Sequence, residues 1–391
     1  MSFLSQFSFL LDGLRAVTWQ QLVMYVIGGL LIWLALKWDF EPALLMPMGF
    51  GAILVNIPFS GVINQTMEGL DGTVVGIIDW LFEVGIETSE AMPILLFIGI
   101  GAMIDFGPIL SNPRMLFFGA GAQFGIFLTL VVALLLGFDL RDAASIGIIG
   151  AADGPTSILV SQVLESKYVG AIAVAAYSYM ALVPTIQPFA IKLVTTKKER
   201  MIRMPYNPKS VSRTTRILFP IFVTVIAGFV APASIALVGF LMFGNLLREC
   251  LKLDNLSQTA QTSLANLITI LLGLTIAATM KAEHFVKVDT LIIMLLGLFA
   301  FVFDTIGGVL LAKFMNLFLK EGKKINPMVG AAGISAFPMS ARVIQKMALK
   351  EDNQNHLLMH AVGANVAGQI ASVVAGGIIL SLVPNIIQAL G

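Results

Sequence analysis

The chain alternates between long apolar runs and short polar links, and this pattern restricts its fold more than any other feature. A helix needs about 20 mostly apolar residues to cross a bilayer. Charged residues make up 12% of the sequence and hydrophobic residues 57%, whereas an average soluble protein is about 25% charged. The sequence therefore predicts an all-α, polytopic membrane protein. We expect membrane segments near residues 21–37, 43–60, 93–111, 115–137, 168–195, 215–230, 231–247, 264–281, 289–316 and 357–384.

Three apolar stretches contain residues that interrupt a helix. Residues 43–60 contain Pro47 and Pro58, so this segment is expected to be broken or partly re-entrant. Residues 143–165 and 326–347 are interrupted by Gly, Pro and polar residues. Non-helical backbone at membrane depth is tolerated only where protein or a water-filled cavity surrounds it. We therefore expect the last two stretches to be re-entrant hairpins inside the protein.

The distribution of basic residues predicts how the chain is oriented. Residues 192–216 contain eight of the 24 Lys and Arg residues, and short loops rich in Lys and Arg stay in the cytoplasm. The same rule places the cluster from Lys320 to Lys324 inside. Residues 61–92 carry six acidic residues and no basic residue, so we expect this acidic segment outside.

Two stretches of the sequence match each other. Residues 150–162 read GAADGPTSILVSQ and residues 330–345 read GAAGISAFPMSARVIQ. Both begin Gly-Ala-Ala and end Pro-x-Ser-x-x-Val-x-Gln, and a long apolar helix is expected before and after each. The charge rule places the ends of helices 168–195 and 289–316 inside, so the two hairpins enter from opposite faces. This is the pattern of an inverted-topology repeat, with chance similarity between two Gly/Ala-rich segments as the alternative.

The repeat divides the chain into four parts. We expect N-terminal membrane segments with the acidic external loop over 1–92 and the first repeat over 93–195. A basic loop with connecting helices would follow over 196–263, and the inverted second repeat over 264–391. The transport core would consist of the two repeats, each with its hairpin.

Asp153 lies at the break of the first hairpin. A carboxylate near the bilayer centre is costly unless it is paired or coordinated. Backbone carbonyls freed at such a break, together with a carboxylate, supply the oxygen ligands that a hard cation prefers. We therefore interpret Asp153 as a cation ligand. The structural alternative is an N-cap on the half-helix that starts at Pro155, and the two roles are compatible.

Two further charged side chains lie inside apolar segments. Arg342 stands in the second hairpin where the first copy has Leu159, and it would suit a carboxylate-bearing ligand bound bidentately. The alternative is an arginine that extends to the lipid headgroups. Asp304 lies in the middle of helix 289–316, so it must face protein or water. It is interpreted as a second ion site or a proton relay, or as the partner of a buried hydroxyl.

The motifs resemble those of one known family, the beta subunits of sodium-transporting biotin-dependent decarboxylases, which act on oxaloacetate, methylmalonyl-CoA, malonyl or glutaconyl-CoA substrates. The similar stretches are FIGIGAMIDFGPILSNPR, GIIGAADGPTSILVSQ, AVAAYSYMALVP, INPMVGAAGISAFPMSARVIQ and GANVAGQI, spread over most of residues 20–390. The resemblance implies a translocase that decarboxylates carboxybiotin, exports Na+ and consumes a proton. It also implies an alpha subunit with carboxyltransferase and biotin-carrier parts, a small membrane gamma subunit, an oligomer of beta subunits, and a bacterial or archaeal cell membrane.

The resemblance also implies roles for residues at matching positions. The positions implied for catalysis are Asp153, Tyr179, Ser335 and Arg342. Those implied for contact with biotin are Arg342, Asn326 and Gly330. Those implied for Na+ binding are Asp153, Asn365 and Ser340.

Two other functions remain open at this point. A secondary Na+-coupled organic-anion transporter would share the repeat and the hairpins, and co-purification of a biotinylated partner distinguishes it from the pump. A membrane scaffold would gain nothing from charged groups at membrane depth such as Asp153, Asp304 and Arg342. The sequence identifies neither the carboxylated substrate nor the Na+ stoichiometry.

Overall fold

A computed structural model describes residues 11–38, 42–66, 73–88, 90–205 and 211–390. Over these residues the chain is made of helices and loops, with two strands of two residues each. The predicted all-α fold class is confirmed. Glu68 and Asp71 of the predicted acidic segment, and Lys209 of the predicted basic loop, lie outside the described residues.

Contacts divide the chain into two compact units. The first unit combines residues 1–92 with 266–292, and the second combines 93–265 with 293–391. Segments that are distant in sequence therefore build each unit. The two hairpins predicted from the sequence both lie in the second unit.

The first unit contains two packed helices, a short hairpin and the segment before α18. Its elements are α1 (Asp12–Arg15), α2 (Trp19–Trp38), α3 (Pro42–Val55), β1 (Gln65–Thr66), β2 (Thr73–Val74), α4 (Ile77–Phe82), the π-helix η2 (Glu83–Glu87), most of α16 (Ala265–Ile276), the 3-10 helix η8 (Ala277–Met280) and α17 (Ala282–Phe285). β1 pairs antiparallel with β2. Asn56 is buried after α3, where it donates to the carbonyl of Met280 at 2.9 Å and accepts from the amide of Ala282 at 2.7 Å. This side chain joins the end of α3 to the turn between η8 and α17.

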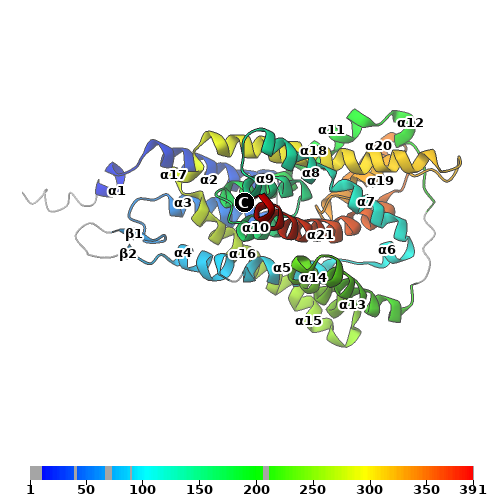
Figure 1. Cartoon of the computed structure of the whole chain (residues 1–391), viewed down its shortest axis with the longest axis horizontal. Coiled ribbons are helices and arrows are strands. Elements are labelled where there is room, and N and C mark those ends of the chain that lie inside the picture. The colour runs from blue at the N-terminus through cyan, green and yellow to red at the C-terminus, as the bar shows by residue number, and fades with distance from the viewer. Residues whose placement is uncertain (1–10, 39–41, 67–72, 89, 206–210, 391) are drawn as a thin grey trace, which may run out of the picture. The chain divides into compact units, whose positions relative to one another are not determined.

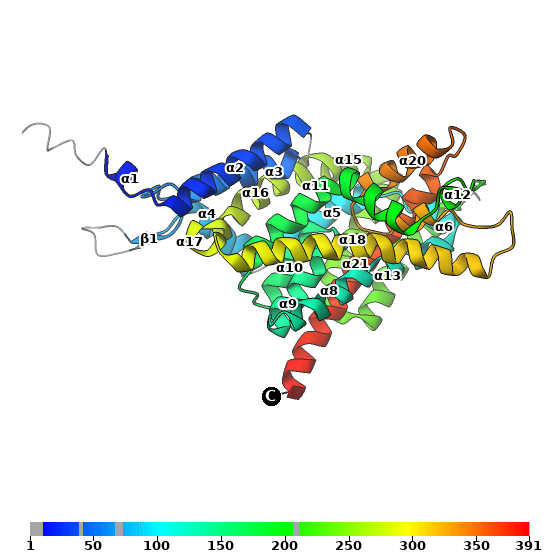
Figure 2. The ribbon, with the colours of Figure 1, turned by 90° about the horizontal axis from the view of Figure 1, so that it is seen from above.

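The second unit is a larger helical bundle. Its elements are α5 (Ala91–Met103), α6 (Gly107–Ser111), η3 (Pro113–Met115), α7 (Leu116–Ala122), α8 (Phe124–Leu135), α9 (Leu140–Gly147), η4 (Ile148–Ala151), α10 (Gly154–Val163), α11 (Val169–Val194), α12 (Lys197–Arg200), α13 (Arg213–Val230), η5 (Pro232–Ser234), α14 (Ile235–Glu249), η6 (Leu251–Leu253), α15 (Asp254–Thr259), η7 (Ala260–Leu264), α18 (Val288–Leu317), α19 (Pro327–Ala331), α20 (Met339–Glu351) and α21 (Leu358–Leu390). Helix α18 is the long yellow helix in Figures 1 and 2.

Several helix ends follow directly from local sequence. Asp139 caps α9 by accepting from the amide of Asp142 at 2.9 Å, and Thr196 forms a capping box with Glu199 at the start of α12. Asn326 caps α19, with Pro327 at the first helical position, where the missing N–H costs nothing. In the predicted hairpins, such short-range signals fix the starts of α9 and α19.

Five of the ten predicted membrane segments, 21–37, 115–137, 264–281, 289–316 and 357–384, match a helix long and apolar enough to cross a membrane. Among the described residues, five helices have the length and composition to cross a membrane, or up to seven if each of two bent pairs forms one span. The predicted segment 168–195 is α11, which bends by 73° between Met180 and Leu182. The predicted segment 115–137 is interrupted at Gln123, between α7 and α8. In 43–60, by contrast, α3 continues through Pro47 and ends before Pro58.

Both predicted re-entrant stretches are interrupted helices. We call α9, η4 and α10 (residues 140–163) the first hairpin, and α19 with α20 (residues 327–351) the second hairpin. Helix α21 packs against α9 and α10 of the first hairpin and against α19 and α20 of the second. Figures 1 and 2 show α21 in red beside α10. This one helix therefore supports both interruptions.

Candidate functional site

The breaks of the two hairpins contact each other. In the first hairpin η4 ends at Ala151, and Ala152 adopts a left-handed backbone with φ 53° before Asp153. In the second hairpin the helix is interrupted between Ala331 and Met339. The amide of Ser335 in this gap donates to the carbonyl of Ala151 at 3.1 Å. The interruptions of the two hairpins thus meet at one place, inside the second unit.

Asp153 is buried at this meeting point, with 3% of its surface exposed. It occupies the N-cap position of α10, but its side chain makes no capping hydrogen bond to the helix backbone. Instead, Oδ2 accepts from the hydroxyl of Thr156 at 2.8 Å and from that of Ser372 at 3.3 Å. Of the ion pairs among the described residues, none includes Asp153. The carboxylate is therefore held by neutral donors alone.

One face of α21 lines both breaks. Asn365 donates from Nδ2 to the carbonyl of Ile334 at 2.6 Å, and the hydroxyl of Ser335 donates to the carbonyl of Gly368 at 3.1 Å. One turn further on, Ser372 reaches Asp153. Residues 365, 368 and 372 are spaced by three and four, so they lie on the same side of the helix. Oδ1 of Asn365 is buried and has no hydrogen-bond partner among the described residues.

The tyrosine beside Asp153 is Tyr177 rather than Tyr179. A Cβ atom on Gly154 would clash with the ring of Tyr177, so this ring covers the residue next to Asp153. The hydroxyl of Tyr179 donates to the carbonyl of Met294 in α18, and its ring lies against Gly297. The catalytic role of Tyr179 stays a prediction, and the geometry adds Tyr177 as a neighbour of the carboxylate.

Ser340 is buried at the start of α20 and is bonded to α11. Nε2 of Gln187 donates to the hydroxyl of Ser340 at 2.7 Å and to the carbonyl of Ala331 at 2.9 Å. Gln187 therefore joins α11 to both halves of the second hairpin. The role of Ser340 as a Na+ ligand stays a prediction.

Asn326 and Gly330 shape the start of the second hairpin. Nδ2 of Asn326 donates to the carbonyls of Arg200 and Ile202, both at 2.8 Å. A Cβ atom on Gly330 would clash with the carbonyl of Gly308, so glycine allows α19 and α18 to cross at close range. Both residues therefore have structural contacts within the chain. Their predicted contact with biotin stays a prediction.

Arg342 lies on the exposed face of α20. Its guanidinium makes no ion pair or hydrogen bond with another described residue. Lys346 and Lys350 are exposed on the same helix. A groove of about 300 Å³ between α11 and α20 is lined by Pro184, Pro188, Lys192, Val343, Lys346, Met347, Lys350 and Glu351. The second hairpin thus presents free cationic side chains that the first hairpin lacks.

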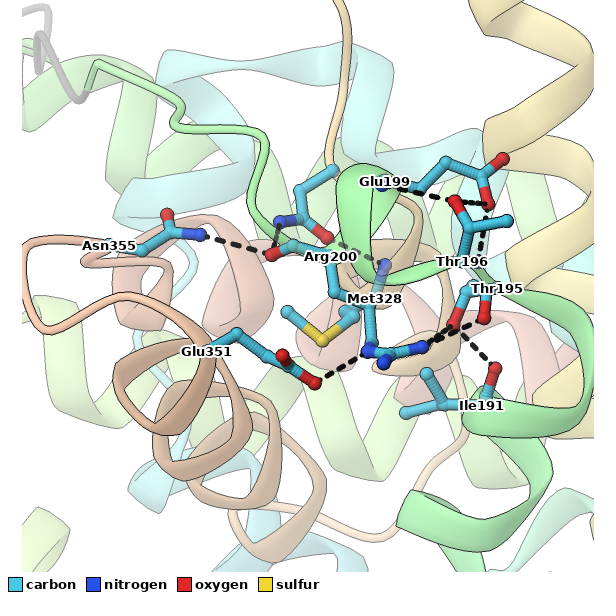
Figure 3. Close-up of polar contacts among 9 residues, drawn as sticks. Ile191, Thr195, Thr196, Glu199, Arg200, Met328, Glu351 and Asn355 are labelled. Carbon is cyan, nitrogen blue, oxygen red and sulfur yellow. Dashed lines mark hydrogen bonds and ion pairs between the residues drawn. The ribbon is translucent and has the colours of Figure 1, made fainter.

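Arg200 holds the far end of α20 in place (Figure 3). Its guanidinium pairs with Glu351 at 2.7 Å and donates to the carbonyl of Thr195 at 2.8 Å. Its own carbonyl accepts from Nδ2 of Asn355 at 3.2 Å. The side chains of Arg200 and Glu351 are only 12% and 16% exposed. This cluster joins the segment after α11 to the last turn of the second hairpin.

Several residues of the site were not predicted from the sequence. The hydroxyls of Thr156 and Ser372 bond Asp153, Tyr177 covers Gly154, and Gln187 bonds Ser340. A usable signal was present for Ser372, because it follows Asn365 at helical spacing in a mostly apolar helix. The role of Gln187 depends on a contact with a residue far along the chain, which spacing does not reveal.

The chain matches a protein-family model over residues 20–383, and that family is described as the Na+-transporting oxaloacetate decarboxylase beta subunit. It is similar to the methylmalonyl-CoA decarboxylase subunit beta of Veillonella parvula, with 47% identity over 96% of this chain and 96% of the relative. It is also similar to the glutaconyl-CoA decarboxylase subunit beta of Acidaminococcus fermentans, with 46% identity over 95% and 96% of the two chains. The oxaloacetate decarboxylase beta chain of Haemophilus ducreyi is 42% identical over 96% of this chain and 98% of its own length.

Proposed function

The chain belongs to the family of Na+-transporting oxaloacetate decarboxylase beta subunits, and we propose that it binds Na+ where its two hairpins meet, with Asp153 as the central ligand. It is the membrane subunit of a decarboxylase sodium pump, a multi-pass membrane protein that works with other subunits. The Na+ site, the residues that act on the carboxyl group and the way they are coupled are the new parts of the proposal.

The burial of Asp153 between neutral donors is the observation that carries the proposal. A buried carboxylate without a cationic partner is unfavourable unless it binds a cation or a proton. The hydroxyls of Thr156 and Ser372 donate to Asp153 in this structure. With Na+ bound, the same oxygens would turn their lone pairs to the ion, because a hydroxyl hydrogen rotates freely.

The remaining ligands would come from the second repeat. Oδ1 of Asn365 is a buried acceptor without a partner among the described residues, and an amide oxygen is a suitable ligand for a hard cation. Asn365 already bonds the break of the second hairpin through Nδ2. Ser340 would join the ligand set only if its hydroxyl turned away from Gln187, which now donates to it.

Arg342 is proposed to bind the carboxyl group that drives the pump. Biotin on a partner subunit would supply that group as carboxybiotin, whose decarboxylation releases CO2 and leaves a nitrogen that takes up one proton. The exposed guanidinium of Arg342 has no other partner among the described residues, and a guanidinium pairs with a carboxylate through two parallel hydrogen bonds. Asn326 and Gly330 would act with it by fixing the second hairpin in place. Tyr179 and Ser335 are kept as further candidates for the reaction.

Competition for Asp153 would couple the two processes. A proton and Na+ bind the same oxygens, so Na+ binding would displace a proton from Asp153 and make it available to the reaction. Relative movement of the two repeats would then expose the site to the other side of the membrane. The proposed partners are an alpha subunit with a biotin carrier, a small gamma subunit and further copies of this chain, in a bacterial or archaeal cell membrane.

Proteoliposomes that contain the complex test this function. Asp153→Asn should abolish Na+ uptake driven by decarboxylation, whereas Asp142→Asn should retain it. Asp142 is a matched control because it is a buried carboxylate of the same hairpin, which accepts from Ser166 at 2.8 Å and from the amide of Lys167 at 3.1 Å. Retention of coupled transport in Asp153→Asn would refute the proposal. A streptavidin blot of the purified complex should detect a biotinylated partner, which a Na+-coupled organic-anion transporter would lack.

A further inference from the structure

Asp304 is a second buried carboxyl group in the transport core. It lies in the middle of α18, and none of its surface is exposed. Among the described residues no Lys, Arg or His forms an ion pair with it. A buried charge without a counter-ion is among the most costly features that a fold can contain. The group therefore needs an explanation that the Na+ site does not provide.

One oxygen of Asp304 is satisfied by the start of another helix. Helix α8 begins at Phe124, after the interruption at Gln123, so the amides of its first turn have no acceptor within the helix. The amide of Ile126 donates to Oδ1 of Asp304 at 3.1 Å. A helix N-terminus favours negative charge. Asp304 thus caps α8 from a neighbouring helix, and this contact by itself explains only Oδ1.

The other oxygen of Asp304 faces the break of the first hairpin. Oδ2 is buried and has no hydrogen-bond partner among the described residues. A Cβ atom on Gly150 would clash with Oδ2, so the oxygen lies directly against the backbone of η4. Asp153 follows two residues after η4. The unsatisfied oxygen therefore contacts the segment that also carries the proposed Na+ ligand.

The surroundings of Oδ2 suit a proton better than a metal ion. A hard metal cation needs several oxygen ligands, and the positive end of the α8 dipole opposes it. A proton needs one oxygen. Neither α8 nor η4 contains a charged or titratable residue. The titratable groups next to these elements are Asp153, which follows η4, and Tyr179. The hydroxyl of Tyr179 donates to the carbonyl of Met294 in α18.

We propose that Asp304 is a proton-binding site, separate from the Na+ site at Asp153, which exchanges a proton on Oδ2 as the break of the first hairpin moves. Two opposing influences act on its charge: burial favours the neutral acid, and the amide at the start of α8 favours the carboxylate. A shift of η4 against Oδ2 changes this balance, so movement of the hairpin is converted into uptake or release of one proton. The inference rests on the proposed function, because Na+ binding at Asp153 is the event that would shift η4 against Oδ2.

Infrared difference spectroscopy of the purified complex in lipid tests this site. Spectra are recorded with and without Na+ at constant pH, and binding of radioactive ²²Na+ is measured on the same samples. The wild-type difference spectrum should contain the carbonyl band of a protonated carboxyl group that is absent from Asp304→Asn, beside a band from Asp153 that remains in this variant. Asparagine keeps the oxygen that accepts from the amide of Ile126, so Asp304→Asn should unfold at the same thermal midpoint as the wild type. Its ²²Na+ affinity should stay within about twofold of the wild-type value.

Two further variants keep the test decisive. Asp304→Glu should restore a carboxyl band at a shifted frequency, and Gly150→Ala should shift the wild-type band by pressing on Oδ2. A difference spectrum of Asp304→Asn identical to that of the wild type would overturn the proposal, as would loss of ²²Na+ binding in that variant with the fold intact. Failure of the proposed function gives a different result, because ²²Na+ would then still bind to Asp153→Asn.

Discussion

The two hairpins have the same interrupted form but differ in what they expose. In the first hairpin every residue from 142 to 161 is buried, including Asp142 and Asp153. In the second hairpin residues 325 to 336 are buried, but α20 exposes Arg342, Lys346 and Lys350. The exposed cation of the first hairpin, Arg141, is paired with Glu165. The first hairpin thus places carboxyl groups where water is excluded, and the second carries, on an accessible helix face, cationic groups without an ion pair among the described residues.

This difference indicates how one repeated element can serve two roles. A cation that must be transported needs oxygen ligands inside the protein. A carboxyl group delivered by another subunit needs a cation within its reach. The hydrogen bond from the amide of Ser335 to the carbonyl of Ala151 joins the two hairpins.

Exchanging matched residues between the hairpins should have the largest effect. Leu159, which is 4% exposed, occupies the position in the first hairpin that corresponds to Arg342 in the second. Leu159→Arg should prevent recovery of folded protein, because it buries an unpaired charge at a cost of several kcal/mol. Arg342→Leu should fold normally and lose decarboxylation. Size-exclusion chromatography of the two variants checks this, and normal folding of Leu159→Arg would contradict the comparison.

Arg342 itself should set the affinity for the carboxylated partner. Arg342→Ala should raise the KM for this partner by about 10- to 100-fold, since a charge-assisted hydrogen-bonded pair contributes roughly 1.5–3 kcal/mol. Arg342→Lys should recover part of the loss, because lysine keeps the charge but not the two parallel hydrogen bonds. Lys346→Ala removes an exposed cation one turn away and is the control. An equal rise in KM for Arg342→Ala and Lys346→Ala would show that the partner is attracted by the total charge of α20 and not bound by Arg342 in particular.

The Arg200 cluster should contribute to stability rather than to chemistry. Arg200→Ala leaves Glu351 partly buried without its cation, and we expect a loss of about 2–3 kcal/mol in the free energy of unfolding. Arg203→Ala is the comparison, because the side chain of Arg203 is 57% exposed where it pairs with Asp352, so solvent screens this cation more than it screens Arg200. Thermal midpoints of the two variants in detergent compare them. A larger loss for Arg203→Ala would contradict this account of how α20 is held.

The smallest expected effect is a pH dependence at the end of the second hairpin. The hydrogen bond and charge of Arg203 hold the pKa of Asp352 below its usual value. A lowered pKa stabilises the fold above the ordinary value of about 3.9 and loses this contribution as the pH falls through the lower, folded value. The difference in thermal midpoint between wild type and Asp352→Asn should therefore be constant from neutral pH down to about pH 5 and shrink below about pH 4. A difference that grows as the pH falls would contradict the assignment.

Much of this organisation was predictable from the sequence because it is local. Apolar length predicted most of the long helices, and Gly with Pro predicted the interruptions at 143–165 and 326–347. Asp153 was recognisable because a carboxylate in an apolar segment is rare. The contact of Asp153 with Thr156 is also local, because the two residues are three positions apart at the start of α10.

The rest depends on contacts between distant segments. Tyr177 and Tyr179 point to nearly opposite sides of their helix, and nothing near them in the sequence indicates that the side with Tyr177 covers Gly154. The continuity of α3 through Pro47 shows that packing can override a local signal. The acceptor role of Asp304 toward Ile126 joins residues 178 positions apart, which no periodicity could predict.

The central claim is that the buried carboxylate of the first hairpin is the Na+ ligand, and equilibrium binding of ²²Na+ to the purified complex tests it most directly. Asp153→Asn should weaken binding by about a hundredfold or more, because loss of a desolvated charged ligand costs roughly 3–5 kcal/mol. Asp142→Asn, in the same hairpin, and Arg342→Ala, in the other, should bind Na+ as the wild type does. Wild-type affinity in Asp153→Asn would contradict the account.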